Sequence, residues 1–533
     1  MERINLYWER PTCRSDVIAR DGVVASSQPL ATQAGLEIIR KGGNAVDAAV
    51  AVAAVLDVVE PFSTGCGGDA FVLIHLSGSS RPLSYNGSGR SGSLVSLQEL
   101  LDLGWTSIPA RGGPPVTVPG ALHLWCYVVE KHGALEMKDI LAPAIHYARN
   151  GFPVSPIIAQ DWRGIIRVLK NDSAREIYAP NGKVPIKGQV MNNPDLANTF
   201  ERIIEDGPSA FYSGKIAESI VNTVQKHGGF LTMEDLAAHK TTLTKPISVS
   251  YRGIDVFEHP PNSQGFAALS MLNIMETFDF SEFSPLSTER YHLMIEAKKL
   301  AYADLHQHNA DPTFYDIPLK KLLSKSYARN RAKMIDANHA MTVYAPGLLL
   351  GQDTAYFATA DRAGNAVSFI NSLYMGIGSG LVAPGTGIKL QNRGHLFSLD
   401  SEHPNCYAPK KLPFHTIIPS ALYKDGKLMG VYGIMGGAHQ AQAHGQFVSN
   451  VVDYGMSPQD ALDYPRFDHD HSTNKVGLEN GISPQIQGEL RKRGHILIHE
   501  TSSYFGGGQA IFRLDEAWIA GSDFRKDGQA AGF

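Results

Sequence analysis

Thr354 is the residue whose type and position best suit it to attack another molecule. It opens a run of strand-forming residues directly after a polar loop, and Asp353 stands immediately before it. If the Asp353–Thr354 bond is cut, Thr354 gains a free α-amino group whose pKa of about 7.7–8.0 lies near neutral pH. This amine can accept the proton of the threonine hydroxyl, so the nucleophile needs no separate histidine. The pattern predicts hydrolysis or transfer of an amide-bound acyl group, although most threonines that open a strand are simply β-forming residues.

A pair of glycines could stabilise the negative charge that such a reaction creates. Gly436 and Gly437 end the apolar run YGIM and are followed by AHQAQAH, which could begin a helix. With no side chain in the way, their N–H groups can point into a cleft, and one such donor contributes about 2.7–4 kcal/mol to transition-state stabilisation. By spacing alone, however, two glycines after a strand are more often an ordinary turn.

Two other patterns resemble ligand sites but fail in their context. GSGRSG, at Gly87–Gly92, matches a dinucleotide-binding pattern, but residues 103–115 lack the acidic residue that such a site needs, so we expect a tight loop. In 468–471 only alternate residues of Asp-His-Asp-His would share one face of a strand, and His306 and His308 would not share one face of a helix. The sequence therefore predicts no nucleotide cofactor and no catalytic metal.

The composition is that of a globular protein with a large core. Of its 533 residues, 43% are hydrophobic and 19% are charged, and the formal net charge is -4. Without a basic excess or a Lys/Arg-rich run, the protein is not expected to bind nucleic acid. No apolar core of a secretory signal is found in the first twenty residues, and the stretch DAAVAVAAVLDVV is too short for a membrane span. We therefore expect a cytoplasmic protein with no membrane segment.

The elements that must position Thr354 change in character along the chain. Helical periodicity dominates the first two-thirds, for example in residues 30–43 and 288–308. From about residue 354, short β-type runs with turns between them prevail, beginning with TAYFATAD, RAGN and AVSFINSLY, and including LFSL and LPFHTIIPSALY. Strand-like runs in the first part, such as GVVASS and AFVLIHL, could complete the same sheets. We therefore expect helices packed outside stacked sheets in one compact body.

The order of motifs along the chain resembles that of the γ-glutamyltransferase (γ-glutamyltranspeptidase) family, and particularly its divergent, acylase-like members. The resemblance extends from about Val23 to Phe533. Its landmarks are GGNAVDAAVA, PFSTGCGGDAF, VTVPG, LAPAIHYARNGF, GGFLTMEDLAAH, EAKKLAYAD, Thr354 with GNAVSF, YGIMGGAH, GGGQAI and GSDFRKDGQAAG. Agreement of so many motifs in one order is not expected by chance.

This resemblance implies an α/β (α+β) fold, a four-layer αββα sandwich of the N-terminal-nucleophile hydrolase type. It also implies a precursor that is cut into a large fragment, residues 1–353, and a small fragment, residues 354–533, which stay associated. Thr354 would be the nucleophile, with Gly436 and Gly437 as oxyanion-binding amides. Ser372 would supply a second hydroxyl where relatives normally carry Thr. No cofactor is implied.

Several positions that would contact a γ-glutamyl substrate depart from the family pattern. Where relatives hold the substrate α-carboxylate with an arginine, this sequence has Asn86, with Arg90 close enough to substitute. The family's paired serines align with His415 and Thr416. The histidine two residues after the nucleophile is Tyr356.

The family's Asn, Gln and Asp that contact the substrate α-amino and α-carboxylate groups align with Tyr374, Arg393 and Leu396. Loss of the acid at Leu396 would leave a ligand ammonium without a partner, which costs several kcal/mol once it leaves water. Arg393, by contrast, could pair with a carboxylate. These changes favour an acyl group without an α-amino group, such as glutaryl.

We therefore expect an autoprocessing enzyme that cleaves a small-molecule amide through an acyl-enzyme on Thr354. Its substrate would be a γ-glutamyl-type amide such as glutathione, or else a glutaryl-like or other side-chain amide. A third alternative is an unprocessed homologue without catalytic activity. The processed unit could also pair as a homodimer.

Overall fold

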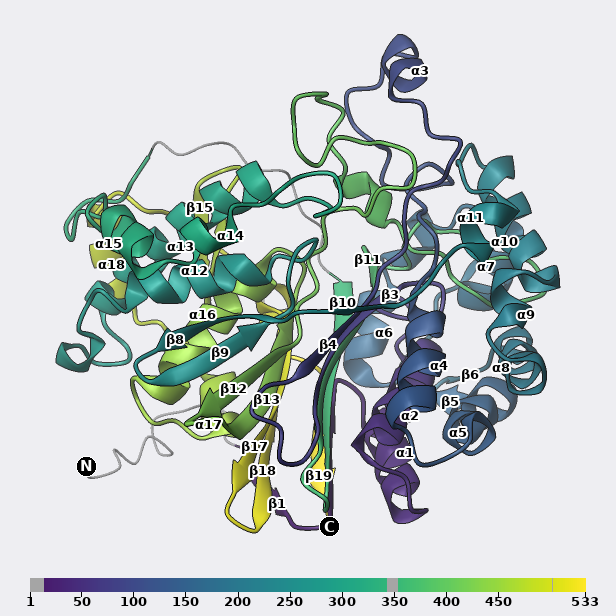
Figure 1. Cartoon of the computed structure of the whole chain (residues 1–533), viewed down its shortest axis with the longest axis horizontal. Helices are drawn as coiled ribbons and strands as arrows, with labels where there is room; N and C mark the ends of the chain where they lie inside the picture. Colours follow the sequence, from purple (N-terminus) through teal and green to yellow (C-terminus); the bar gives the residue numbers. More distant parts are fainter. Residues whose placement is uncertain (1–13, 343–352, 501) are drawn as a thin grey trace.

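Two seven-stranded antiparallel sheets lie face to face in the centre of the molecule (Figure 1). This computed structural model describes residues 14–342, 353–500 and 502–533. The first sheet contains, in spatial order, β1 (Val17–Ala19), β18 (Ala517–Ser522), β17 (Gly507–Leu514), β13 (Lys427–Met435), β12 (Ser420–Lys424), β9 (Ile254–Glu258) and β8 (Ile247–Tyr251). The second contains β19 (Gln529–Gly532), β2 (Gly22–Ser26), β10 (Asp353–Asp361), β11 (Ala366–Tyr374), β3 (Asp69–His75), β4 (Leu83–Gly87) and β7 (Thr242–Thr244).

Side chains that alternate along the strands fill the space between the sheets. In β10, Tyr356 and Ala358 face the other sheet, whereas Phe357 faces the helices outside. Both faces of the strand are therefore buried, which explains its nearly continuous apolar sequence. At Gly433 the two sheets approach so closely that a Cβ atom would lie 2.4 Å from the ring of Tyr356.

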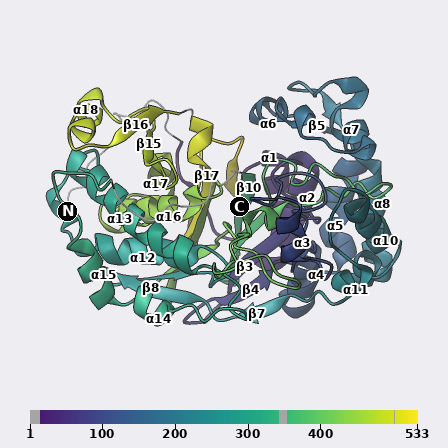
Figure 2. The same ribbon diagram turned by 90° about the horizontal axis from the view of Figure 1, so that it is seen from above.

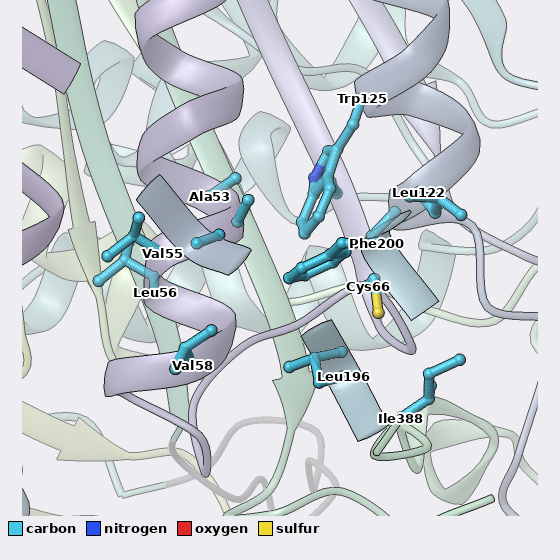
Figure 3. Close-up of a cluster of buried hydrophobic side chains, with 14 of the residues drawn as sticks. Ala53, Val55, Leu56, Val58, Cys66, Leu122, Trp125, Leu196, Phe200 and Ile388 are labelled. Atoms are coloured by element: carbon cyan, nitrogen blue, oxygen red, sulfur yellow. The ribbon is translucent and has the colours of Figure 1, made fainter. Parts of the chain in front are cut away.

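One layer of helices covers the outer face of the second sheet. Its main members are α1 (Pro29–Arg40), α2 (Ala45–Val59), α4 (Ala121–His132), α5 (Met137–Asn150), α8 (Pro194–Asp206) and α10 (Lys215–Lys226). Every residue of α2 is buried, as expected from its apolar sequence. Leu56 of α2, Trp125 of α4 and Phe200 of α8 belong to the core of this layer (Figure 3).

A second layer of helices covers the outer face of the first sheet (Figure 2). It contains α12 (Gly265–Met275), α13 (Thr288–His308), α15 (Lys325–Ala332), α16 (His439–Val452), α17 (Pro458–Asp463) and α18 (Pro484–Lys492). Helices and sheets thus form the expected four-layer αββα sandwich.

Short elements complete the fold. The remaining helices are α3 (Leu97–Asp102), α6 (Pro156–Trp162), α7 (Asp172–Tyr178), α9 (Ser209–Tyr212), α11 (Met233–Ala237) and α14 (Leu319–Leu322). The remaining strands are β5 (Phe152–Pro153), β6 (Val190–Met191), β14 (Phe467–Asp470), β15 (Lys475–Leu478) and β16 (Ile496–His499). Among the described residues, no helix is both long and apolar enough to cross a bilayer.

The sequence-based division into a helix-rich first part and a sheet-rich second part is too simple. Each central sheet combines strands from both sides of residue 353, and three helices of the second layer follow that residue. The run LFSL and the first half of LPFHTIIPSALY are loops instead of strands. Side chains satisfy part of the backbone there, since Phe414 N donates to Asn405 Oδ1 and Ile418 N to Gln440 Oε1.

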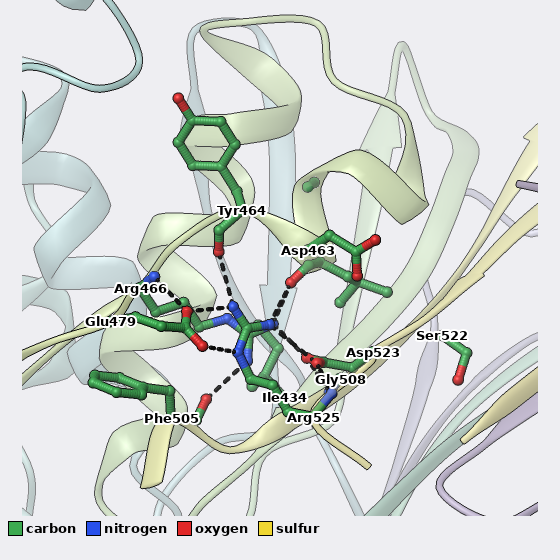
Figure 4. Close-up of polar contacts among 12 residues, drawn as sticks. Ile434, Asp463, Tyr464, Arg466, Glu479, Phe505, Gly508, Ser522, Asp523 and Arg525 are labelled. Atoms are coloured by element: carbon green, nitrogen blue, oxygen red, sulfur yellow. Dashed lines mark hydrogen bonds and ion pairs between the residues drawn. The ribbon is translucent and has the colours of Figure 1, made fainter. Parts of the chain in front are cut away.

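A buried network of charges fixes the segment between β18 and β19 (Figure 4). Arg525 Nε donates to Glu479 Oε1 over 2.7 Å, and Arg525 Nη1 pairs with Asp523 Oδ1 at 3.0 Å. Arg466 Nη2 bonds the other oxygen of Asp523 at 2.6 Å, and this oxygen also accepts from Gly508 N. The network therefore holds the glycine-rich start of β17 in place.

Candidate active site

Thr354 lies at the start of a central strand, as its sequence context predicts. β10 extends from Asp353 to Asp361, so Thr354 is its second residue. The pairing of β10 with β11 shifts register between Asp353 and Ala355, which is the signature of a β-bulge. Bulges redirect a side chain and are frequent beside active sites. The Thr354 side chain is buried, with 1% of its surface exposed.

The second hydroxyl expected beside the candidate nucleophile is in place. Ser372 Oγ on β11 lies 3.0 Å from Thr354 Oγ1, within hydrogen-bond distance. The Ser372 hydroxyl also accepts from Tyr374 N at 2.8 Å and from Arg393 Nη2 at 3.1 Å. A serine thus occupies the place that the resemblance implied for a threonine, with the hydroxyl pair intact.

Arg393 is buried and donates a hydrogen bond from Nη2 to Ser372 Oγ. Its Nη1 donates to Thr416 Oγ1 over 2.8 Å, and its guanidinium carbon lies 4.6 Å from the centre of the Tyr374 ring. The side chain is fully buried, and burial lowers the pKa of Arg393 to about 10, which still leaves it charged at neutral pH. The structure therefore places a buried cation next to Thr354 and Ser372.

A carboxylate that the sequence did not single out lies on the neighbouring strand. Asp69 on β3 pairs directly opposite Ser372 in the β3–β11 ladder. Its Oδ1 accepts from Gly89 N at 3.0 Å, and its Oδ2 lies 3.2 Å from His415 Nε2 without the alignment of a hydrogen bond. Burial raises the pKa of Asp69 to about 7, and the charge of Arg393 opposes this rise.

His415 stays neutral beside this carboxyl group. Burial, reinforced by the positive charge of Arg393, holds the pKa of His415 well below its usual value. Its ring also packs against Phe71, with the ring centres 4.8 Å apart. The structure therefore brings together two predicted site residues, Arg393 and His415, with the unpredicted Asp69.

Gly436 and Gly437 connect β13 to α16, which confirms the expected strand–helix transition. Their φ angles are 135° and 57°, in the region that favours glycine. A Cβ atom on Gly436 would come within 3.2 Å of Gly506 Cα, so two glycine segments lie against each other. The two glycines thus precede a helix N-terminus, where amide groups commonly bind negative charge.

Neighbouring elements hold this glycine loop. Tyr302 of α13 donates from its hydroxyl to the carbonyl of Ala438. Gln264, before α12, donates from Nε2 to Gly437 O at 2.8 Å and to Thr416 O at 2.5 Å. Only the amide nitrogen of Gln264 can bond two carbonyl oxygens, so its orientation is fixed.

A continuous path of hydrogen bonds links the hydroxyl pair to the glycine loop. From Ser372 it runs to Arg393 and then to the hydroxyl of Thr416. The carbonyl of Thr416 continues it to Gln264, which ends at Gly437. Residues from five separate places in the sequence therefore form one connected site.

Asn86 and Arg90 lie in a neighbouring part of the site, along the wall of a cavity of about 270 Å³. Thr354 is not among the residues that line this cavity. Asn86 Nδ2 donates to Asn262 Oδ1, and Arg90 pairs with the buried carboxylate of Asp311 at 2.7 Å. Arg90 is thus already neutralised and is a weaker candidate than Arg393 for binding a substrate carboxylate.

Leu396 and Tyr356, two positions that differ from the family pattern, pack in hydrophobic clusters. Leu396 packs in a buried hydrophobic cluster with Tyr374, so it offers no polar contact. Tyr356 fills the space between the sheets, and its hydroxyl lies 2.8 Å from Ser368 Oγ. Tyr356 contributes packing at the place where family members have a histidine.

The patterns set aside as ligand sites have structural explanations. Gly89 and Gly92 permit close backbone contacts, since their Cβ atoms would lie 1.6 Å from Val118 O and 2.0 Å from Phe230 O. In the 468–471 stretch, Asp468 binds His439 at 2.8 Å and His469 binds Lys298 at 3.0 Å. His308 bonds the hydroxyl of Tyr315.

Among the described residues, one group has the geometry to hold a metal ion. The ligand atoms of His292, Glu296 and His495 all lie within 4.8 Å of one another. However, Glu296 already pairs with the ammonium of Lys299 at 2.8 Å, so a buried cation balances its charge. This group lies outside the hydrogen-bond path described above.

Two residues of the site, Asp69 and Gln264, were not predicted from the sequence. Asp69 could have been singled out, because it directly precedes the apolar run AFVLIHL and would therefore lie at the start of a buried strand. Acids are rarely buried unless they are paired, so an acid at that position calls for a partner. Gln264 had no such signal, since a glutamine in a Pro/Gly-rich loop is normally exposed.

Comparisons with known proteins place the whole chain in one family. The family model described as gamma-glutamyltranspeptidase matches residues 31–533. The glutathione hydrolase-like YwrD proenzyme of Bacillus subtilis is 40% identical over 97% of this chain and 99% of its own length. The glutathione hydrolase proenzyme of Escherichia coli is 34% identical over 90% of this chain and 86% of its own.

A solved structure is also similar along the whole chain. The cephalosporin acylase from Bacillus halodurans superimposes with a TM-score of 0.93 at 41% identity. The match covers 98% of each chain. Both a glutathione hydrolase and an acylase are therefore among the proteins that this chain resembles.

Proposed function

Because this chain belongs to the γ-glutamyltranspeptidase family, we propose that it is an autoprocessing amidohydrolase or acyltransferase with Thr354 as its nucleophile. The chain is an enzyme of a family whose similar members are hydrolases. The observation that carries the proposal is the 3.0 Å contact between Thr354 Oγ1 and Ser372 Oγ at the bulged start of β10. A proenzyme form of the relatives supports cleavage at Asp353–Thr354.

The reaction begins after cleavage has freed the α-amino group of Thr354. This amine accepts the hydroxyl proton, and Oγ1 attacks the amide carbonyl to form a tetrahedral intermediate. The leaving amine takes up the proton as the carbon–nitrogen bond breaks, which leaves an ester on Thr354. Water then hydrolyses the ester, or an acceptor amine takes the acyl group. Ser372 orients the attacking oxygen through their hydrogen bond.

The amides of Gly436 and Gly437 would bind the oxyanion of the tetrahedral intermediate. Their position before α16 supports this role, because a helix N-terminus carries a partial positive charge. The contacts from Tyr302 and Gln264 support it further, since donors that are held in place need no reorganisation during the reaction.

The substrate class that the relatives favour is a γ-glutamyl-type amide, such as glutathione. An acylase that removes glutaryl-like groups is the second candidate. It is favoured by the buried Arg393 next to Ser372, which can pair with a carboxylate, and by the likeness to a cephalosporin acylase.

Replacement of the nucleophile tests the proposal. The parent protein should separate into two chains on a denaturing gel, with the smaller beginning at Thr354. Thr354→Ala should remain a single chain and lose all amide turnover, because it lacks the hydroxyl. Thr354→Ser keeps a hydroxyl and should retain part of the self-cleavage and part of the amide turnover. If Thr354→Ala matured and turned over amides like the parent, the assigned nucleophile would be wrong; an intact, inactive parent would support the non-catalytic alternative.

A further inference from the structure

Four buried polar atoms close to Thr354 make no hydrogen bond within the described chain. They are Asp69 Oδ2, Arg393 Nε and both ring nitrogens of His415, of which Nε2 lies 3.2 Å from Asp69 Oδ2. All three side chains are fully buried. Most buried polar groups in folded proteins have a partner, so a cluster of exceptions requires an explanation. These atoms are an acceptor, a donor and two ring nitrogens, each of which can be either.

The cluster is close enough to the nucleophile to contact a bound acyl group. Asp69 pairs with Ser372 across β3 and β11, and Arg393 donates to the same Ser372 hydroxyl. Ser372 in turn contacts Thr354. A γ-glutamyl group is short, so its charged end must lie near the carbonyl that Thr354 attacks.

The cluster also adjoins the cavity described above. Asp69 Oδ1 accepts from Gly89 N, and the residues on both sides of Gly89, Ser88 and Arg90, line the cavity wall. Asp69 therefore lies directly behind the wall of this cavity.

The charges in the cluster match a ligand that carries both signs. Arg393 provides a positive charge, and Asp69 provides a carboxyl group that gains a negative charge near neutral pH. An amino-acid head group can place its carboxylate at Arg393 and its ammonium at Asp69. A monocarboxylic acyl group such as glutaryl satisfies Arg393 alone and brings a second negative charge towards Asp69.

We propose that Asp69 determines substrate specificity by accepting the α-ammonium of a γ-glutamyl group whose α-carboxylate pairs with Arg393. Asp69 on β3 thereby replaces the acid that the family has at Leu396, which lies outside the strands of both sheets. This inference rests on the proposed function of Thr354 and selects the γ-glutamyl class over the glutaryl class.

The test compares γ-glutamyl and glutaryl p-nitroanilides, which differ only in the α-amino group. Asp69→Asn keeps the shape of the side chain but removes its charge. We expect kcat/KM for the γ-glutamyl compound to fall at least about tenfold, mainly through KM, and that for the glutaryl compound to stay equal or rise. Glu234→Gln removes an acid from the same cavity wall without touching the cluster, so its substrate preference should be that of the parent.

A second measurement uses the parent protein and does not depend on the folding of a variant. The preference for the γ-glutamyl compound should rise between about pH 5.5 and 7, because Asp69 ionises over this range while most of the substrate ammonium stays charged. The groups that face Asp69 are Arg393, His415 and Gly89 N; neither the charged Arg393 nor the neutral His415 changes its charge in this range. The amine of Thr354 affects both substrates equally and cancels in the ratio.

Two results would overturn the role of Asp69: an equal fall for both substrates in Asp69→Asn, or a preference ratio that does not change with pH. Either result would leave the proposed function intact as long as Thr354→Ala remains inactive. Turnover by Thr354→Ala would instead refute the proposed function itself.

Discussion

Burial decides the charge of the groups around Thr354. A carboxyl group in water ionises below pH 5, but burial raises the pKa of Asp69 to about 7. Arg393 limits this rise because its positive charge favours the ionised form. His415 lies 3.2 Å from Asp69 and stays neutral, because burial and the charge of Arg393 lower its pKa. The net charge of the site near neutral pH therefore depends on whether Asp69 is ionised, and a small change in the surroundings of Asp69 can change its ionisation state.

This shift in pKa predicts how stability depends on pH. The folded-state pKa of Asp69 is raised, so the folded protein keeps the proton of Asp69 more firmly than the unfolded chain does. The contribution of Asp69 to the free energy of unfolding is therefore fully present below about pH 4 and is lost as the pH rises through 7. Asparagine cannot ionise, so Asp69→Asn does not undergo this loss. The free energy of unfolding of the variant, minus that of the protein with Asp69, should therefore increase over the same pH range by up to about 4 kcal/mol. Urea unfolding at several pH values would measure this difference in two uncut proteins, Thr354→Ala with and without Asp69→Asn. Parallel pH profiles would contradict the assigned shift.

Among the secondary-structure elements, the contacts between α12, α13 and the loop before α16 are the most relevant to catalysis. The loop of Gly436 and Gly437 contains no side chain that could fix it. Tyr302 of α13 and Gln264 before α12 bond the carbonyl groups of Ala438 and Gly437, so they hold the two peptide units that directly follow the proposed oxyanion-binding amides. The precision of the oxyanion site thus depends on helices distant in the sequence.

Gln264→Met should therefore impair the reaction more than it impairs folding. Methionine keeps an unbranched side chain of similar length but donates no hydrogen bond. We expect kcat to fall about tenfold or more with little change in KM, because the oxyanion forms only during the reaction. Steady-state kinetics on processed protein would measure both constants.

Gln446→Met is the matched control for this change. Gln446 is also buried and donates from Nε2 to two carbonyl groups, those of Gln442 and Phe467, each at 3.1 Å. It should lower the melting temperature as Gln264→Met does, but leave kcat near the parent value. Equal losses of kcat in the two variants would show that Gln264 acts only on stability.

At the scale of the whole molecule, the proposed cut does not divide the fold into two bodies. β10 begins one residue before the cut and lies between β2 and β11, so the second sheet joins strands from both fragments. The first sheet is also mixed, because β9 pairs with β12. The core between the sheets likewise contains side chains from both fragments.

The two fragments should therefore stay together after processing. Gel filtration in native buffer should give one peak that contains both chains, and only a denaturant should separate them. Residues 354–533 expressed alone should fail to fold, because their strands would lack paired neighbours in both sheets. A soluble, folded small fragment would contradict this expectation.

The sequence alone determined the features that depend on neighbouring residues. Thr354 at the start of a strand, the glycine pair after β13 and helices such as α13 follow from local periodicity and turn chemistry. The family motifs added the four-layer sandwich and the place of Ser372. These predictions succeeded because each depends on a short segment or on a pattern shared by the whole family.

Only the tertiary structure decided which distant residues surround Thr354. Asp69 and Arg393 are separated by more than three hundred residues, and the register between β3 and β11 puts Asp69 beside Ser372. Local periodicity contains no information about strand register between remote segments, nor about which polar group is buried with which charge. For the same reason the sequence could not predict the role of Gln264, nor that β3 brings an acid towards the site where Leu396 offers none.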